Sequence, residues 1–95
     1  MKYVIYSKYD PKDRDLVMAR AKKINEKLEK EPSKYPKEIF GPHSIGGGTS
    51  SLSIVEAKEE QLMNYRHLWM PLQEVDFVPL FDSRKLSEKF PTTMK

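Results

Sequence analysis

The feature that most constrains this chain is a strand pattern near both of its ends that is apolar on both faces. In the segment 74–81, apolar side chains take both parities: Val75, Phe77 and Phe81 on one, Val78 and Leu80 on the other. In the segment 3–6, Tyr3 and Ile5 alternate with Val4 and Tyr6. A small domain covers one face of a sheet with its own helices, and apolar surface left in water forgoes about 25 cal/mol per Å². We therefore expect a partner on the second face, namely another copy of the chain.

Length and composition indicate one globular domain. The 95 residues are 38% hydrophobic and 33% charged, which is typical of a folded protein. We assign residues 1–90 to a single domain and 91–95 to a C-terminal tail. A chain of this size buries only about 60–65% of its unfolded surface, so dimer formation would add buried area.

Composition also excludes several classes of function. The absence of cysteine excludes disulfides, thiolate catalysis and cysteine-ligated metals. No apolar run approaches the ~20 residues of a membrane span, and the N-terminus lacks a signal-peptide pattern, so we expect a cytoplasmic protein. The net charge of +3 is spread along the chain, which favours solubility over nucleic-acid binding.

Periodicity and turn residues predict the secondary structure. We expect strands over 2–9, 38–45, 52–57 and 75–81, and helices over 11–30, 58–70 and 84–90. Asp10 and Pro11 form a helix start, and the buried stripe of the first helix comprises Val17, Ala21, Ile24 and Leu28. Pro42 indicates an edge strand or a bulge, because proline cannot donate to a ladder. Asp82 or Ser83 caps the last short helix.

The resulting order is βαββαβ, which predicts an α+β fold with a four-stranded antiparallel sheet. The first and third strands lie in the centre and both helices cover one face, in the ferredoxin-like arrangement. The turn between the second and third strands contains Gly46, Gly47 and Gly48. It lacks the following helix and the further fixed residues of a phosphate-binding loop, so we interpret it as a hairpin turn.

The chain resembles members of the dimeric α/β-barrel superfamily, and more narrowly a small uncharacterised family of that type. The residues that carry the resemblance, over about 1–82, are Gly41-Pro42-His43, Gly46-Gly47-Gly48, Ile54-Val55-Glu56-Ala57, Trp69 and Val78-Pro79-Leu80. The resemblance implies a homodimer in which two ferredoxin-like units pack their open sheet faces together. The wider superfamily includes cofactor-independent monooxygenases, haem-degrading enzymes, isomerases and ligand-sensing domains, and fold alone cannot choose among them.

Two residues are candidates for catalysis. His43 lies on the same strand parity as Ile39 and Ile45, which would point it into a covered face, where it could act as a base or remain structural. Glu56 ends a strand and could orient the His43 ring across the hairpin, but a slip of one residue would put the two on opposite faces. Glu56 could equally be a solvated strand end. His67 is expected on the polar side of the second helix.

Aromatic residues supply a candidate ligand site, with ordinary core packing as the alternative. The expected ligand-binding set is Tyr6, Phe40, His43, Glu56, Tyr65, Trp69 and Phe77. No metal site or cofactor is expected. The third strand lacks the aromatic residues with which RNA-recognition modules of the same order stack bases, so we expect no nucleic-acid partner and no membrane partner.

Three functional hypotheses follow. The first is a homodimer that binds a small, partly apolar molecule in or beside its barrel. The second is a cofactor-independent oxygenase or isomerase that uses His43 as base, with Glu56 or a tyrosine as helper. The third is a structural or interaction module without a pocket.

Overall fold

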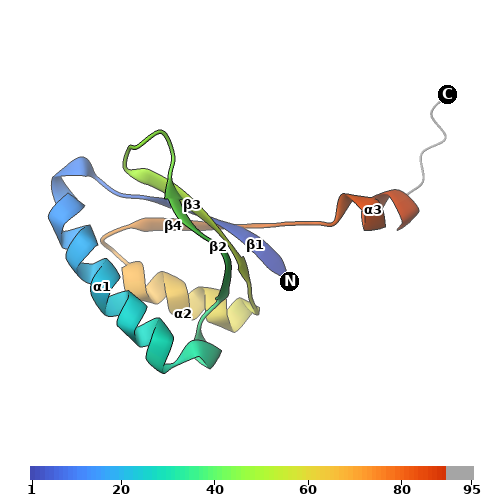
Figure 1. Cartoon of the computed structure of the whole chain (residues 1–95), viewed down its shortest axis with the longest axis horizontal. Coiled ribbons are helices and arrows are strands. Elements are labelled where there is room, and N and C mark those ends of the chain that lie inside the picture. Colours follow the sequence, from blue (N-terminus) through green and yellow to red (C-terminus); the bar gives the residue numbers. More distant parts are fainter. Residues whose placement is uncertain (90–95) are drawn as a thin grey trace.

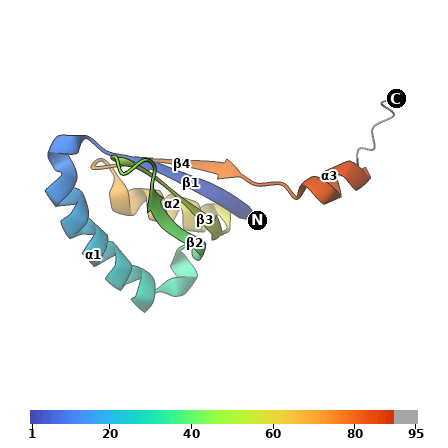
Figure 2. The ribbon, with the colours of Figure 1, turned by 45° about the horizontal axis from the view of Figure 1, so that its top comes forward.

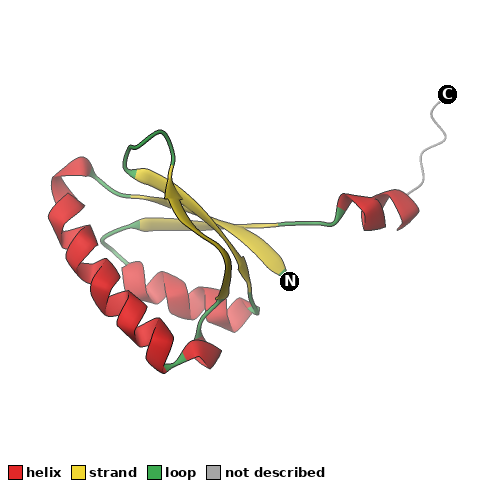
Figure 3. Ribbon diagram, in the orientation of Figure 1, coloured by secondary structure: helices red, strands yellow, loops and turns green. Residues whose placement is uncertain are grey.

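The computed structural model describes residues 1–89 (Figure 1). Phe90, expected to end the last helix, and the tail 91–95 lie outside the described residues. The elements in chain order, coloured by type in Figure 3, are β1 (Lys2–Lys8), η1 (Pro11–Asp13), α1 (Arg14–Lys30), η2 (Pro32–Lys34), β2 (Lys37–Ser44), β3 (Ser50–Glu56), α2 (Glu59–Trp69), β4 (Glu74–Pro79) and α3 (Ser83–Lys89).

The four strands form one open antiparallel sheet in the order β2-β3-β1-β4. Helices α1 and α2 lie on the same side of it, and the other side carries no helix among the described residues (Figure 2). The expected α+β class and the four-stranded antiparallel sheet are therefore confirmed, and the arrangement is compatible with a ferredoxin-like fold. Within residues 1–89, no helix is both long and apolar enough to cross a bilayer.

The core lies between the two helices and the sheet. Val17 and Ile24 of α1 are buried, with Ala21 and Leu28 packed beside them, as the predicted stripe requires. The buried residues that form the core cluster are Ile5, Val17, Ile24, Val55, Ala57, Leu62, Trp69 and Val75. The start of the first helix is confirmed at Asp10, whose Oδ1 accepts the Lys12 N–H at 3.1 Å, although the first turn is the 3₁₀ helix η1.

The hairpin of β2 and β3 is irregular at its outer strand. Register shifts occur between Glu38 and Phe40 and between Phe40 and His43, on either side of Gly41-Pro42. The edge position expected from Pro42 is confirmed. Gly46 and Gly47 have φ of 65° and 74°, which side-chain-bearing residues rarely adopt, so glycine is required in this turn.

The register places a row of residues on each face. On the side without helices, Val4 of β1 lies opposite Ile54 and Val78, and Phe40 lies opposite Ile54. We call this side the open face. The next row across the open face contains His43, Leu52, Tyr6 and Asp76. Apolar residues therefore occupy both faces of the sheet, as the sequence predicts.

The C-terminal part departs from the prediction for the last strand. β4 ends at Pro79, and Leu80 N–H makes the last bond to β1, donating to the Lys2 carbonyl at 2.9 Å. Phe81, expected in the strand, lies beyond that bond. Asp82 Oδ1 accepts the N–H groups of Arg84 at 2.9 Å and Lys85 at 3.3 Å, which confirms the predicted cap of α3.

Candidate functional site

A cavity of about 260 Å³ lies between α1 and the helix side of the sheet. Val17, Ala21 and Ile24 form its apolar wall. Tyr65 and Trp69 of α2 also line it, together with Gln73 in the turn that follows. Its volume is slightly below the 300–1,000 Å³ typical of ligand pockets, so it suits a molecule smaller than a drug.

The sheet contributes five serines to this cavity, from three adjacent strands. Ser50 is one of them, and the other four lie on the parity that faces the helices: Ser7, Ser44, Ser51 and Ser53. Ser51 of β3 lies opposite both Ser7 of β1 and Ser44 of β2. We call these four residues the serine floor. It forms because serines in all three strands fall on the parity that faces the helices, where valine or isoleucine would be the usual choice.

The serine floor is partly buried and has little hydrogen bonding of its own. Ser7 and Ser53 are each only 8% exposed. Among residues 1–89, the only one of the four hydroxyls with a recorded hydrogen bond is that of Ser44, which donates to the Gly48 carbonyl at 2.9 Å. The other three hydroxyls can bond to water or to a polar ligand in the cavity.

Trp69 contributes a buried donor without a hydrogen bond to the wall. It is 6% exposed, and its Nε1 has no hydrogen-bond partner within the described chain. Burial raises the pKa of the neighbouring Tyr65 hydroxyl. The Trp69 side chain partly opposes this change, although the two groups do not reach full hydrogen-bond geometry, and the Glu38 carboxylate adds to it. Tyr65 is thus held in its neutral form.

Charged groups are absent from the cavity lining as far as the structure describes it. None of its residues is Asp, Glu, Lys, Arg or His. A charged ligand would therefore be buried without a counter-charge, which is costly, whereas an uncharged molecule meets hydroxyls, amides and apolar surface. No carboxylate or imidazole is positioned in this lining to transfer a proton.

His43 lies elsewhere. It is exposed on the open face, and its ring stacks on Phe40 with centroids 4.4 Å apart and planes 11° apart. Its Nδ1 donates to the Gly41 carbonyl at 2.8 Å. His43 therefore lies on the face without helices. Each of the two register shifts in β2 adds one residue, which puts Phe40 and His43 on the same face although their positions differ in parity.

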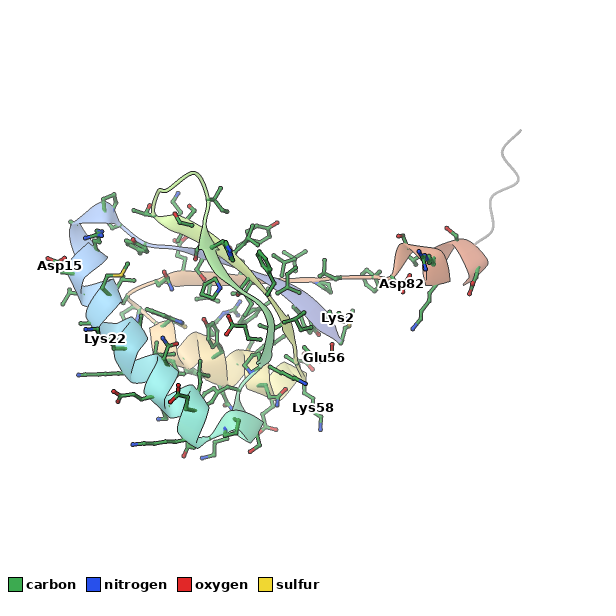
Figure 4. The ribbon with its side chains drawn as sticks, in the orientation of Figure 1. Lys2, Asp15, Lys22, Glu56, Lys58 and Asp82 are labelled. Atoms are coloured by element: carbon green, nitrogen blue, oxygen red, sulfur yellow. The ribbon has the colours of Figure 1, made fainter. Side chains whose placement is uncertain are left out.

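Glu56 is also separate from His43. Its Oε1 accepts the N-terminal ammonium of Met1 at 3.1 Å, at the end of β3 (Figure 4). Its neighbour on β2 is Lys37, whereas the neighbour of His43 on β3 is Leu52. Leu52 and Glu56 are four residues apart, or about 13 Å along a strand at about 3.3 Å per residue. The structure therefore does not bring the two candidate catalytic residues together.

The seven residues expected to bind a ligand fall into separate places. Tyr65 and Trp69 line the cavity. Tyr6, Phe40 and His43 lie on the open face, and Glu56 lies at the strand end described above. Phe77 lies on the helix side, where the Arg66 guanidinium sits 4.6 Å from its ring centre.

His67 is exposed on α2, on the polar side expected for it. Within residues 1–89, no cluster of His, Asp or Glu could hold a metal ion.

Sequence reasoning missed the serine floor. The signal for it was present, because Ser51 and Ser53 share a parity with the buried Val55. Polar residues on a core-facing parity mark either a solvated face or a cavity. Comparison with known proteins finds no matching family, no matching curated protein and no matching solved structure. The geometry of the chain itself therefore carries the argument about function.

Proposed function

We propose that the protein is a homodimer of the dimeric α/β-barrel type that binds a small, uncharged, partly apolar molecule in the cavity beneath α1. The observation that supports this most strongly is the cavity itself. It combines an apolar helix wall with the serine hydroxyls of the sheet and with the buried Nε1 of Trp69, which lacks a hydrogen-bond partner within the described residues.

The chemistry of the lining defines the ligand. Trp69 Nε1 is a donor only, so its partner must be an acceptor such as a carbonyl, ether or hydroxyl oxygen. The serine hydroxyls both donate and accept. The other side of the ligand would contact Val17, Ala21 and Ile24, which favours a compact hydrocarbon body.

The open face supports the homodimer. It carries apolar residues across all four strands, and the row Phe40, Ile54, Val4 and Val78 is continuous from edge to edge. Phe40 and Val78 are 43% and 44% exposed in a single subunit. Opposite charges lie opposite one another at both ends of this surface, Lys2 with Glu56 and Lys8 with Glu74. A continuous apolar patch with a charged rim is typical of an interface.

A matched pair of probes tests ligand binding. Cyclohexyl methyl ketone and cyclohexanecarboxylate have nearly the same shape, but only the second is charged. We expect the ketone to raise the melting temperature and to change the fluorescence of Trp69, which is the only tryptophan in the chain. The carboxylate should do neither.

The outcomes separate the hypotheses. Equal effects of the two probes would contradict an uncharged site. If neither the ketone nor neutral alcohols and amides of similar size have an effect, the proposed binding function is wrong. The hypothesis of an interaction module without a ligand would then be favoured. Sedimentation at micromolar concentration tests the homodimer, and a stable monomer would overturn that part of the proposal.

A further inference from the structure

The C-terminal arm, which we define as Leu80–Glu88, extends away from the rest of the subunit (Figures 1 and 2). Every residue of the arm is exposed, including Phe81 at 64% and Leu86 at 42%. The described chain measures 54 × 31 × 19 Å, and the arm lies along the longest dimension.

An arm of this kind needs a surface to pack against. Helix α3 has only seven residues, whereas isolated helices shorter than about 12–15 residues are marginal in water. The Asp82 cap and the bond from Ser87 Oγ to the Ser83 carbonyl are local and do not bury Leu86. Because β4 is bonded to β1 as far as Leu80, the arm leaves at the end of the sheet and does not return to its own core.

A second copy of the chain offers a matching surface. At the opposite end of the sheet lies a groove of about 240 Å³, lined by Tyr6, Lys8, Ile45, Ser50, Glu74 and Asp76 together with Ser7 and Ser51 of the serine floor. Tyr6 and Ile45 are exposed apolar residues within it. If two open faces pack with their strands antiparallel, the Pro79 end of one β4 lies beside the Glu74 end of the other. The arm of each subunit then reaches this groove in its partner.

The charges also match. Leu86 lies next to the basic pair Arg84 and Lys85, whereas the groove carries the carboxylates of Glu74 and Asp76 against the single ammonium of Lys8. Apolar burial would supply most of the affinity, and the opposite charges would fix the orientation.

We propose that α3 of each subunit docks into the Tyr6–Ile45 groove of a second copy of the chain, with Arg84 and Lys85 beside Glu74 and Asp76. This inference rests on the proposed homodimer. It adds an exchange of arms at the end of the sheet, beyond the apolar row of Phe40, Ile54, Val4 and Val78.

Because the chain contains no cysteine, crosslinking provides a direct test. Full-length Leu86→Cys and Ile45→Cys variants are mixed, allowed to exchange subunits and oxidised. We expect a disulfide between positions 86 and 45, identified by mass spectrometry of the linked peptides. Lys22→Cys, which places the thiol on α1 away from the sheet (Figure 4), replaces Ile45→Cys as the control and should give little of this product.

A charge exchange provides the second test. The double variants Glu74→Lys/Asp76→Lys and Arg84→Glu/Lys85→Glu should each raise the dimer dissociation constant about three- to tenfold at low salt, and a mixture of the two should recover part of the loss.

The outcomes distinguish the arm from the dimer itself. A monomer by sedimentation would overturn the homodimer and the arm exchange with it. A stable dimer in which position 86 crosslinks no better to position 45 than to position 22, and in which the charge variants do not compensate, would overturn the arm exchange alone.

Discussion

Ser7 and Ser51 lie opposite each other on β1 and β3, on the side of the sheet that faces the helices. Ser44 continues the row on β2. Three neighbouring strands thus place hydroxyl groups where a small domain would ordinarily place branched aliphatic side chains. The cavity above them is the physical consequence, since serine leaves space and unfilled hydrogen bonds that valine would remove.

Replacement of one floor serine by valine tests this interpretation. We expect Ser53→Val to leave the free energy of unfolding unchanged or to raise it by up to about 1 kcal/mol, because valine favours strands and buries more apolar surface at a position that is 8% exposed. The same variant should weaken binding of the neutral ketone, because it removes a hydroxyl donor and its methyl groups narrow the cavity.

The control for that variant is Ser33→Val, at an exposed position in η2. It should change neither stability nor binding. Destabilisation of Ser53→Val by 2 kcal/mol or more in urea unfolding would show that the hydroxyl has a structural role, contrary to our interpretation. The margin corresponds to the cost of breaking a buried hydrogen bond, about 1–3 kcal/mol.

The packing of the core gives a second prediction. Ile5 is 2% exposed at the centre of the sheet, so Ile5→Ala should lower the free energy of unfolding by about 2–5 kcal/mol through lost burial and a new cavity. Leu16→Ala, at a residue that is 61% exposed on α1, should change it by less than about 0.5 kcal/mol. Chemical denaturation measures the free energy of unfolding of both variants. Similar losses for the two would show that Leu16 of α1 is packed against the core, contrary to the structure.

The raised pKa of Tyr65 gives a third prediction. Its ordinary value is 10.0, and burial raises the value in the folded state. Above pH 10 the unfolded chain releases this proton while the folded chain retains it, so the free energy of unfolding should fall as the pH rises. The contribution of Tyr65 to the free energy of unfolding is fully present below pH 10 and is lost as the pH rises above it.

Comparison with Tyr65→Phe isolates this effect. The variant cannot titrate at this position, so its stability should fall less steeply between pH 9 and pH 11 than that of the natural chain. Urea unfolding across this range provides the measurement. Parallel curves for the two proteins would mean that the Tyr65 hydroxyl is as accessible in the folded state as in the unfolded one.

The open face gives a fourth prediction. Ile54 lies between Phe40 and Val4 in the apolar row, so Ile54→Lys would bury an unpaired charge in the proposed dimer. We expect the dissociation constant to increase at least about 30-fold, which corresponds to about 2 kcal/mol. Leu16→Lys on the outside of α1 is the control. Sedimentation equilibrium that shows the same association for both variants would place the interface elsewhere.

Much of the fold could be predicted because the signals are local. The stripe of Val17 and Ile24, the cap at Asp10 and the breaks at Pro32 and Pro71 each act within a few residues, and the helices and strands follow them closely. The apolar character of both sheet faces could also be predicted from the sequence, since alternation along a strand assigns each side chain to a face.

The candidate site could not be predicted to the same extent, because it depends on register. Two shifts in β2 put Phe40 and His43 on the same face although their positions differ in parity, and the local sequence does not reveal how many residues a bulge adds. The serine floor likewise exists only once three strands are aligned side by side. The aromatic character of Tyr65 and Trp69 makes them candidates for a ligand site from the sequence. Their position beside the serines is a property of the tertiary structure.

The most direct test of the proposed site uses the single indole N–H of the chain. Trp69 should give one indole signal in a proton–nitrogen correlation spectrum, and an acceptor that occupies the cavity should shift it. We predict a saturable downfield shift with cyclohexyl methyl ketone that is weakened in Ser53→Val and absent with cyclohexanecarboxylate. An indole signal that stays unchanged at saturating ketone, or that moves equally with the carboxylate, would contradict an uncharged binding site beneath α1.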